Sequence, residues 1–457
     1  MKHDVIKRQD PLEAESPAGS DEGRARSGAR YDLATALRLV RRMETSAGRG
    51  AVFEEVKNKN TLYRLVDTLY SKAGTTVQPL LLFAYMIKSV LMLGPFGSED
   101  AEAVSISNFE NERHSVDRVA ALVPELRLLR LTPKRRHLLG RGQLRAAIQL
   151  MGFGPRIWSF LSLLVRSHSF MPSARIASAL AFYIRFLQLL ADRPRLTAAI
   201  VASNYSPEAL GLAAAAHSLG RRVIYINHAP VPANAPLVPP VLADCAIFYG
   251  DAVRRTYERR SRCQGEVALI GQPWTTRPMQ WRNEITTVGI FLTSGTKIDV
   301  VSDLVAAIRA SQPGVRILIR NHPVALLRSD FSDLVARHEN VAITIGNPLD
   351  HEIAACDLIF CGNSGVAMNA VSGGRPVAYM DPLDRSGFDY NGFVESGLVC
   401  AVSGWSNDLY SQLKRFYQAP GWDDVMRNYD ASYGEDSTCL EHAAAETVKR
   451  HLRPTPV

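Results

Sequence analysis

The feature that most constrains the fold of this 457-residue chain is an alternation of strand-like and helix-like segments from about residue 197 to residue 381. The first series runs LTAAIVASN, SPEALGLAAAAHSLG, RRVIYINHAP, VLADCAIFYG, DAVRRTYERRS and EVALIGQPW. Apolar strand-like runs separated by helical segments predict parallel strands with helices on the faces of the sheet. In the alanine-rich segment, Ser206, Pro207 and Gly220 suit the N-cap, the first helical position and the C-terminal stop.

A second series follows the polar stretch at 276–285. Its strand-like runs are TTVGIFLTSG, VRILIRNHP, VAITIG, DLIFCGN and RPVAYMD, and a helical segment follows each of the first four. Five such strands predict a second doubly wound sheet. The expected fold is therefore α/β, with two Rossmann-like doubly wound domains facing a cleft and an extra helical N-terminal region.

The N-terminal half reads as mainly helical from 31 to 196. The apolar stretch 77–97 carries Lys88 at its centre, which favours a buried helix, with an interfacial helix as the second choice, over a membrane-spanning one. The apolar stretch 157–191 is expected to form two core helices, separated at Pro172. The expected division of the chain is a disordered lead-in at 1–30, the helical region with a first Rossmann-like domain at 31–275, a linker at 276–285, a second Rossmann-like domain at 286–425 and a C-terminal helical segment at 426–457.

Ligands of doubly wound sheets bind outside the carboxyl ends of the strands, so the strand exits are the candidate site. In the second series these exits are polar. FLTSGTK places Thr293, Ser294 and Gly295 at a strand-to-helix turn, where backbone N–H groups can meet a phosphate. FCGNSGVAMNA places Asn363, Ser364 and Gly365 at a similar turn, with Asn363 or Ser364 at the N-cap. Arg320 and His322, in RNHP, would add positive charge.

Each of these residues also has an ordinary structural explanation. A serine or asparagine at a helix start is usually only a cap, and a histidine before proline is often a turn residue. Their occurrence on one edge of one predicted sheet favours a nucleotide or phosphate site.

The pair ILIRNHP and LIFCGNSGVAMNAVSGGRPVAYMD resembles the nucleotide-binding half of GT-B glycosyltransferases that build bacterial surface polysaccharides. The most similar patterns are the HP and serine motifs of bacterial sialyltransferases, polysialyltransferases and Kdo transferases, and CDP-glycerol polyol-phosphate transferases have a similar layout. The resemblance implies that His322, Ser364 and Asn363, together with Arg320, hold the phosphate and ribose of a CMP-linked donor.

The first series is similar to the acceptor-side domain of the same enzymes through VIYINHAPVP, LADCAIFYGDAVRRTY and VALIGQPW. His228 takes the histidine position, although Ala229 stands where many relatives have glycine and a proline-rich loop follows at 230–240. A base for the acceptor hydroxyl is expected at a strand exit of this domain, and His228 and Glu208 are the candidates. Glu208 at a helix start has the alternative role of complementing the helix dipole.

Composition limits the partners. The formal net charge of +8 is compatible with phosphorylated substrates, an anionic membrane face or nucleic acid. Aromatic residues are only 8% of the chain, and no stacking motif with interleaved basic residues is present, which argues against nucleic acid. No Asp-x-Asp triplet occurs, so no metal and no other cofactor is expected. The six cysteines lack metal-ligand spacing and the N-terminus lacks a signal pattern, so a cytoplasmic location is expected, with peripheral contact to the inner face of the membrane.

The resemblance implies a metal-independent glycosyltransferase that moves a sialic-acid-type or Kdo-type sugar from a CMP-linked donor to a glycan or lipid-linked glycan of capsule or lipopolysaccharide, and the composition is compatible with this. Two alternatives stay open. One is a scaffold of a polysaccharide assembly complex that has lost nucleotide binding, and the other is an epimerase-like enzyme acting on a UDP-sugar.

Overall fold

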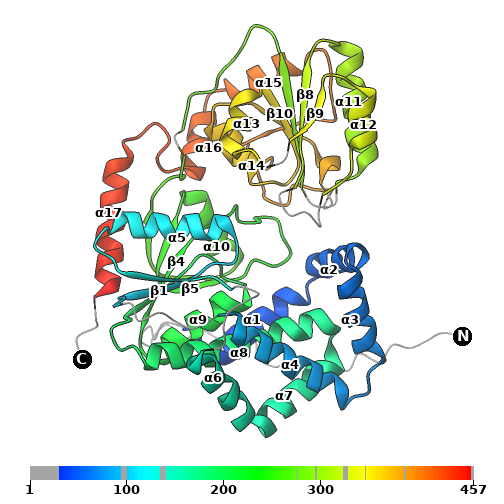
Figure 1. Cartoon of the computed structure of the whole chain (residues 1–457). Helices are drawn as coiled ribbons and strands as arrows, with labels where there is room; N and C mark the ends of the chain where they lie inside the picture. Colours follow the sequence, from blue (N-terminus) through cyan, green and yellow to red (C-terminus); the bar gives the residue numbers. More distant parts are fainter. Residues whose placement is uncertain are drawn as a thin grey trace, which may run out of the picture.

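The structure is a computed structural model, and it describes residues 30–93, 100–133, 140–274, 276–293, 296–322, 328–344, 346–384 and 387–453. Two parallel six-stranded sheets form the centres of two domains, and a group of helices extends from the first domain (Figure 1). The predicted fold class is confirmed, because both sheets carry helices on their faces and both are doubly wound.

The first sheet has the strand order β2-β1-β3-β4-β5-β6, and all of its strand pairs are parallel. Its strands are β1 (Ala103–Ile106), β2 (Leu128–Leu131), β3 (Ala198–Val201), β4 (Arg222–Ile226), β5 (Val241–Phe248) and β6 (Cys263–Leu269). The mainly helical reading of 31–196 missed β1 and β2. These two strands have only four residues each, and β1 lies beside β3 in the centre of the sheet. The order of the chain therefore reverses between β1 and β3.

The second sheet has the order β12-β11-β10-β7-β8-β9. Its strands are β7 (Thr287–Phe291), β8 (Arg316–Arg320), β9 (Val341–Thr344), β10 (Leu358–Cys361), β11 (Val377–Tyr379) and β12 (Cys400–Ala401). The first five are the predicted strands, and only the two-residue edge strand β12 was missed. The chain reverses direction across the sheet between β7 and β10, which places the expected ligand position of this domain at their exits.

The helices around the first sheet come from three parts of the chain. They are α1 (Leu33–Glu44), α2 (Ala47–Lys59), α3 (Thr61–Lys72), α4 (Val77–Met92), α5 (Glu110–Leu122), α6 (Arg141–Gly152), α7 (Gly154–Ser167), α8 (Phe170–Ala191), α9 (Pro207–Ser218), α10 (Asp251–Arg260) and the C-terminal α17 (Ser437–Leu452). Helix α17 returns from the second domain and packs beside α5 and β6 (Figure 1).

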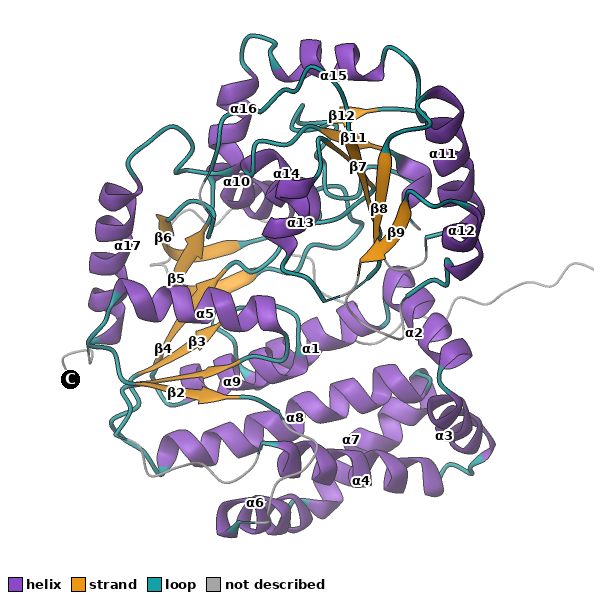
Figure 2. Ribbon diagram, turned by 45° about the horizontal axis from the view of Figure 1, so that its top comes forward, coloured by secondary structure: helices purple, strands orange, loops and turns teal. Residues whose placement is uncertain are grey.

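The second sheet is covered by shorter helices. They are α11 (Ile298–Ser311), α12 (Ser332–Arg337), α13 (Leu349–Ala355), α14 (Val366–Ser372), the 3₁₀ turn η2 (Asp381–Leu383), α15 (Leu409–Tyr417) and α16 (Trp422–Tyr429). Figure 2 shows α11 and α12 along one face of the sheet, and α13 and α14 on the opposite face.

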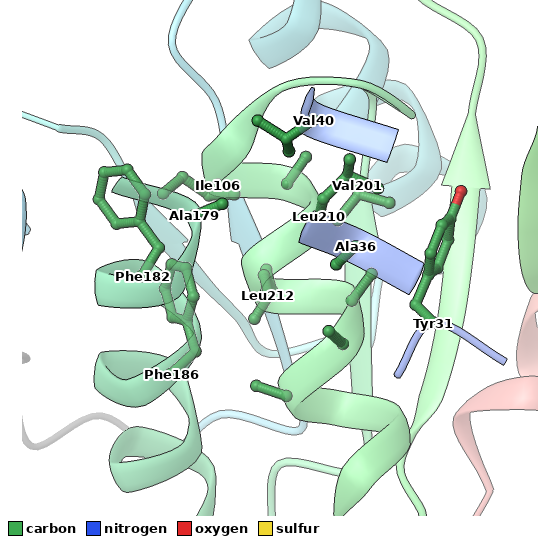
Figure 3. Packing of buried hydrophobic residues seen from close by; sticks show 14 of the residues in the cluster. Tyr31, Ala36, Val40, Ile106, Ala179, Phe182, Phe186, Val201, Leu210 and Leu212 are labelled. Carbon is green, nitrogen blue, oxygen red and sulfur yellow. The ribbon is translucent and has the colours of Figure 1, made fainter. Parts of the chain in front are cut away.

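Helix α9 shows how local sequence and packing agree. The Ser206 hydroxyl accepts a hydrogen bond from the N–H of Ala209 at 3.3 Å, as a serine N-cap should, and Pro207 is the first helical residue. The next turns pack against α8, whose Phe182 and Phe186 lie beside Leu212 (Figure 3). A Cβ at Gly211 would come within 2.9 Å of the Cβ of Phe182, so only glycine allows this close helix crossing.

The predicted helix pair at 157–191 is present as α7 and α8, but it breaks at 168–169, and Pro172 lies inside the first turn of α8, where a proline is tolerated. Among the described residues, α8 is the one helix long and apolar enough to cross a membrane, and two-thirds of its apolar window is buried inside the protein. Helices α6 and α7 together pass the same test but meet at an angle of 77°. The stretch at 77–92 is α4, whose buried stripe includes Leu82 and Met86.

Two chain segments connect the domains, and the buried carboxylate of Asp430 holds them together. It accepts hydrogen bonds from the N–H of Gln272 at 2.9 Å and from the hydroxyl of Thr276 at 2.6 Å on the outgoing segment. It also accepts one from the N–H of Ser432 at 3.0 Å on the returning segment. These bonds fix the crossing point of the two segments beside the facing sheet edges.

Candidate functional site

The carboxyl edges of the two sheets face each other and touch. The loop after β4 continues from His228 to Pro230, and the turn after β10 contains Gly365. A Cβ at Gly365 would lie 3.2 Å from the Cδ of Pro230, so a side chain here would push the two loops slightly apart. Further along the proline-rich loop, the Asn234 side chain donates to the carbonyl of Asp389 at 2.8 Å, and its N–H donates to the carbonyl of Tyr390 at 3.1 Å.

His228 has a defined tautomer in this arrangement. Its Nδ1 is hydrogen-bonded to the carbonyl oxygen of Ala202 at the exit of β3. A carbonyl oxygen only accepts, so Nδ1 carries the proton, and Nε2 keeps its lone pair. Burial lowers the pKa of His228, and the bond to Ala202 opposes this shift only in part. The imidazole is therefore neutral at neutral pH and able to take a proton.

Glu208 lies at the start of α9, behind the exit of β3, and belongs to a buried group of charges. Arg175 on α8 donates to Glu44, the last residue of α1, at 2.6 Å. Burial raises the pKa of Glu208, and the positive charge of Arg175 opposes that shift. The Oε2 atoms of Glu208 and Glu44 are both buried, and neither has a hydrogen-bond partner among the described residues. Arg175 therefore supplies positive charge to two carboxylates, each of which has one oxygen without a hydrogen-bond partner among the described residues.

Both candidate bases are half-buried, and they differ in their surroundings. The Oε2 atom of Glu208 is out of contact with solvent and lies near the charges of Arg175 and Glu112. His228 is half-buried and lies on the loop that touches the second domain. This difference favours His228 as the group that contacts substrate, and Glu208 as part of the charge network behind it.

The sequence analysis missed further residues of this edge because it missed β1. Glu112 at the start of α5 is buried, and its Oε2 accepts from the N–H of Asn108 at 2.7 Å, at the exit of β1. Burial raises its pKa also. Arg49 on α2 lies 5.6 Å from the ring centre of Tyr205, after β3. A polar segment directly after the short apolar run AVSI was the available signal.

In the second domain, Thr293 and the 362–365 turn occupy the reversal point of the sheet. The Thr293 hydroxyl donates to Asp384 at 3.0 Å. The N-cap of α14 is Gly365, not Asn363 or Ser364 as expected. The Ser364 hydroxyl accepts from the N–H of Val366 at 3.3 Å and so still lies at the helix start.

Asn363 has a different role from the expected cap. Its side-chain amide donates to the carbonyl of Phe388 at 2.7 Å and accepts from the N–H of Asn391 at 3.2 Å. The residue therefore holds the segment that also contacts the proline-rich loop of the first domain. Its predicted contact to a nucleotide stays a prediction.

Arg320 and His322 lie at the exit of β8, one strand away from the reversal point. The Arg320 guanidinium forms an ion pair with the buried Glu352 and donates to the carbonyl of Asn347 at 3.1 Å, so its charge is compensated inside the domain. The N–H of His322 donates to the Asn321 side chain at 3.1 Å. Ser294 and Gly295 lie outside the described residues, and so does the proline after His322.

Comparison with known proteins gives distant structural neighbours. No protein-family model matches the chain, and no curated protein matches its sequence. A UDP-GlcNAc 2-epimerase from Neisseria meningitidis, solved bound to UDP-GlcNAc, is 12% identical and covers 77% of this chain and 99% of its own, with a TM-score of 0.48. CalG4, the calicheamicin glycosyltransferase, is 11% identical over 78% of this chain and 100% of its own, with a TM-score of 0.47.

The glycosyltransferase SnogD from Streptomyces nogalater is 14% identical over 76% of this chain and 99% of its own, with a TM-score of 0.44. The fold assignment rests on the two doubly wound sheets of the chain itself.

Proposed function

We propose that this protein is a GT-B-type glycosyltransferase that moves a sugar from a nucleotide-sugar donor to a hydroxyl acceptor. The observation that carries the proposal is the meeting of two unlike strand exits at Pro230 and Gly365. One side offers a neutral histidine with a free lone pair, and the other offers hydroxyl and amide groups at the reversal point of a nucleotide-binding type of sheet.

The reaction follows from this division. The acceptor hydroxyl gives its proton to Nε2 of His228 as its oxygen bonds to the anomeric carbon of the donor sugar. The bond from that carbon to the phosphate oxygen breaks, and the nucleotide leaves with the bonding electrons. His322, the Ser364 hydroxyl and backbone N–H groups near the start of α14 would stabilise the phosphate charge. No step requires a metal ion, and the metal-free reaction is part of the proposal.

The finer assignment is also a proposal and rests on the resemblance of RNHP and GNSG to the HP and serine motifs. It specifies a CMP-linked donor of the sialic acid or Kdo type, and an acceptor in a surface glycan such as capsule or lipopolysaccharide.

A thermal-shift titration of the full chain with CMP, CDP, UDP, GDP and ADP tests the donor class, because a ligand that binds only the folded protein raises its melting temperature. We expect a shift with cytidine nucleotides that His322→Ala removes, while His338→Ala, a histidine away from the sheet edge, keeps it. A shift with UDP alone would overturn the cytidine assignment. No shift with any nucleotide at millimolar concentration would favour the scaffold that has lost nucleotide binding.

One structural observation supports the epimerase-like alternative. The first-domain edge holds His228 and Glu112 near strand exits, and Glu44 and Glu208 share Arg175, which is a richer set of carboxylates than the sequence indicated. Incubation with a UDP-N-acetylhexosamine and no acceptor, followed by chromatography of the sugar, separates the two functions. An epimerised sugar would support the alternative, whereas transfer that depends on an added acceptor would support the glycosyltransferase.

A further inference from the structure

Helices α6 and α7 lie at the end of the molecule away from the second domain (Figures 1 and 2), and they carry several exposed apolar side chains. Fifteen large hydrophobic side chains are exposed among the described residues, and six of them lie between residues 144 and 163. These six define the elbow surface: Leu144, Ile148, Met151, Phe153, Trp158 and Leu163. Such a concentration in a short stretch marks an interaction site.

The elbow surface is the outer side of a helix pair whose inner side is already used. Leu150 on α6 and Ile157 and Leu161 on α7 are buried in the core of the first domain. On α6, Leu144, Ile148 and Met151 follow one another at helical spacing on the opposite side, and each is more than half exposed. Since a helix that is apolar on all sides is normally buried, something is expected to cover this outer side. The buried inner side excludes a spanning arrangement for the folded protein.

Charge identifies the kind of partner. The chain from residue 126 to residue 191 contains no aspartate or glutamate, and α6 and α7 carry Arg141, Arg145, Arg156 and Arg166. All four arginines are exposed. Among the described residues, Asp192 is the carboxylate nearest to this group, 3.6 Å from Arg145. Arginines beside apolar and aromatic side chains, with Trp158 among them, are typical of helices that lie in the interface of an anionic membrane.

An apolar cavity lies next to the same surface. It has a volume of 540 Å³, and its walls include Phe153, Ile157, Leu180 and Leu187, with Arg145 and Arg156 also contributing. The apolar character of this end of the protein therefore extends inward from the elbow surface.

We propose that the elbow surface docks on an anionic lipid bilayer, with the apolar side chains in the outer part of the acyl region and the four arginines at the lipid phosphates. This step does not depend on the glycosyltransferase assignment.

Flotation of the purified full chain with vesicles tests the proposal. Vesicles of phosphatidylcholine alone are compared with vesicles that also contain phosphatidylglycerol, without any nucleotide present. We expect binding to the anionic vesicles only, and weaker binding as salt is raised and the screening length falls from about 10 Å at 0.1 M to about 3 Å at 1 M.

Two variants locate the surface. The double variant Leu144→Glu/Ile148→Glu should lose at least about tenfold in vesicle affinity, because two inserted apolar side chains become charged. The double variant Arg141→Gln/Arg156→Gln should lose about fivefold per arginine. Ile298→Glu is the matched control, since Ile298 is a similarly exposed apolar residue on α11 of the second domain, and it should bind like the wild type.

Three results would overturn the proposal. One is no binding to either vesicle, and another is equal binding to both. The third is binding to the anionic vesicles that remains unchanged in the Leu144→Glu/Ile148→Glu variant. If the chain instead dimerises and this variant makes it monomeric, the elbow surface is an interface between two copies. Nucleotide thermal shifts measured on the same variants report on the sheet-edge site separately.

Discussion

The two facing sheet edges use their polar residues in different ways. The first-domain edge is backed by ionisable groups from distant helices: Glu44 from α1, Arg175 from α8 and Glu208 from α9, with buried carboxylate oxygens left unpaired. The second-domain edge carries mainly hydroxyl and amide groups, and the side chains of Thr293 and Asn363 form hydrogen bonds with neighbouring loops. The first edge is therefore suited to moving protons and charge, and the second to presenting shaped hydrogen-bonding groups to a ligand.

The comparison predicts that single substitutions on the two edges fail in different ways. A change on the first edge should affect turnover, or the stability of buried charges, without altering nucleotide binding. A change on the second edge should alter nucleotide binding and the local loops. If a substitution on the first edge weakened nucleotide binding, or one on the second edge reduced turnover alone, the two edges would not have separate tasks.

His228→Asn is the most severe test of the first edge. The asparagine amide can still donate to the Ala202 carbonyl, but the residue has no base at the position of Nε2. We expect kcat to fall by about 100-fold or more, as for loss of a general base, with nucleotide thermal shifts unchanged. Steady-state kinetics with a CMP-sugar donor measure the effect. A variant that retains most of its kcat would remove His228 from the reaction.

Arg175→Met tests the charge network. The methionine would leave the buried Glu44 carboxylate without its cation, and we expect the free energy of unfolding to fall by about 3 kcal/mol. Urea denaturation gives this value. Arg113→Met, at an exposed pair with Glu110, should change stability by less than about 0.5 kcal/mol.

The double variant Arg175→Met/Glu44→Gln separates charge from packing. Because the glutamine removes the uncompensated charge, it should recover much of the lost stability. If the double variant is as unstable as Arg175→Met, the arginine acts through its packing and not through the carboxylate.

The fold was predictable to the extent that its strands are long and apolar. The strands β3 to β6 and β7 to β11 were all recognised, because each is an apolar run with a polar exit. The short strands β1, β2 and β12 were not. Strand β1, AVSI, has only four residues between polar segments, and β2, LLRL, contains an arginine, so neither gives a strand pattern that local sequence can distinguish from a helix.

The site was predictable only where it depends on strand exits. The positions of His228, Glu208, Thr293 and Ser364 after strand ends were predictable because the end of a strand is visible in the sequence, whereas their roles in binding or catalysis stay predictions. Glu44 and Arg175 were not found, because they reach the edge from helices whose packing on α9 no local pattern encodes. The direction of the Asn363 side chain also depends on a loop 25 residues later in the chain.

Asn363→Ala tests the second edge. The alanine removes two hydrogen bonds to the 388–391 segment, to Phe388 and Asn391, and we expect a loss of about 1 to 2 kcal/mol in stability. Nucleotide affinity should fall as well, because the turn that carries Ser364 loses its neighbour. Asn428→Ala, which removes one hydrogen bond within α16, is the control and should leave nucleotide affinity unchanged. Unchanged affinity in Asn363→Ala would place the nucleotide away from this turn.

Glu208→Gln gives the smallest expected effect, which appears only as a dependence on pH. Since burial raises the pKa of Glu208 above its ordinary value of 4.5, the folded state binds this proton more tightly than the unfolded state does. The stabilisation is complete below about pH 4.5 and is lost as pH rises through the pKa of the folded state. The glutamine variant has no such loss, so its stability relative to the wild type should increase across that range, by at most about 1.4 kcal/mol for each pH unit. Urea denaturation at a series of pH values measures the difference, with the exposed Glu284→Gln as the charge control. If the plots of unfolding free energy against pH run parallel for Glu208→Gln and the wild type, Arg175 fully offsets the effect of burial on the pKa of Glu208. Glu208 would then add no pH dependence to the first edge.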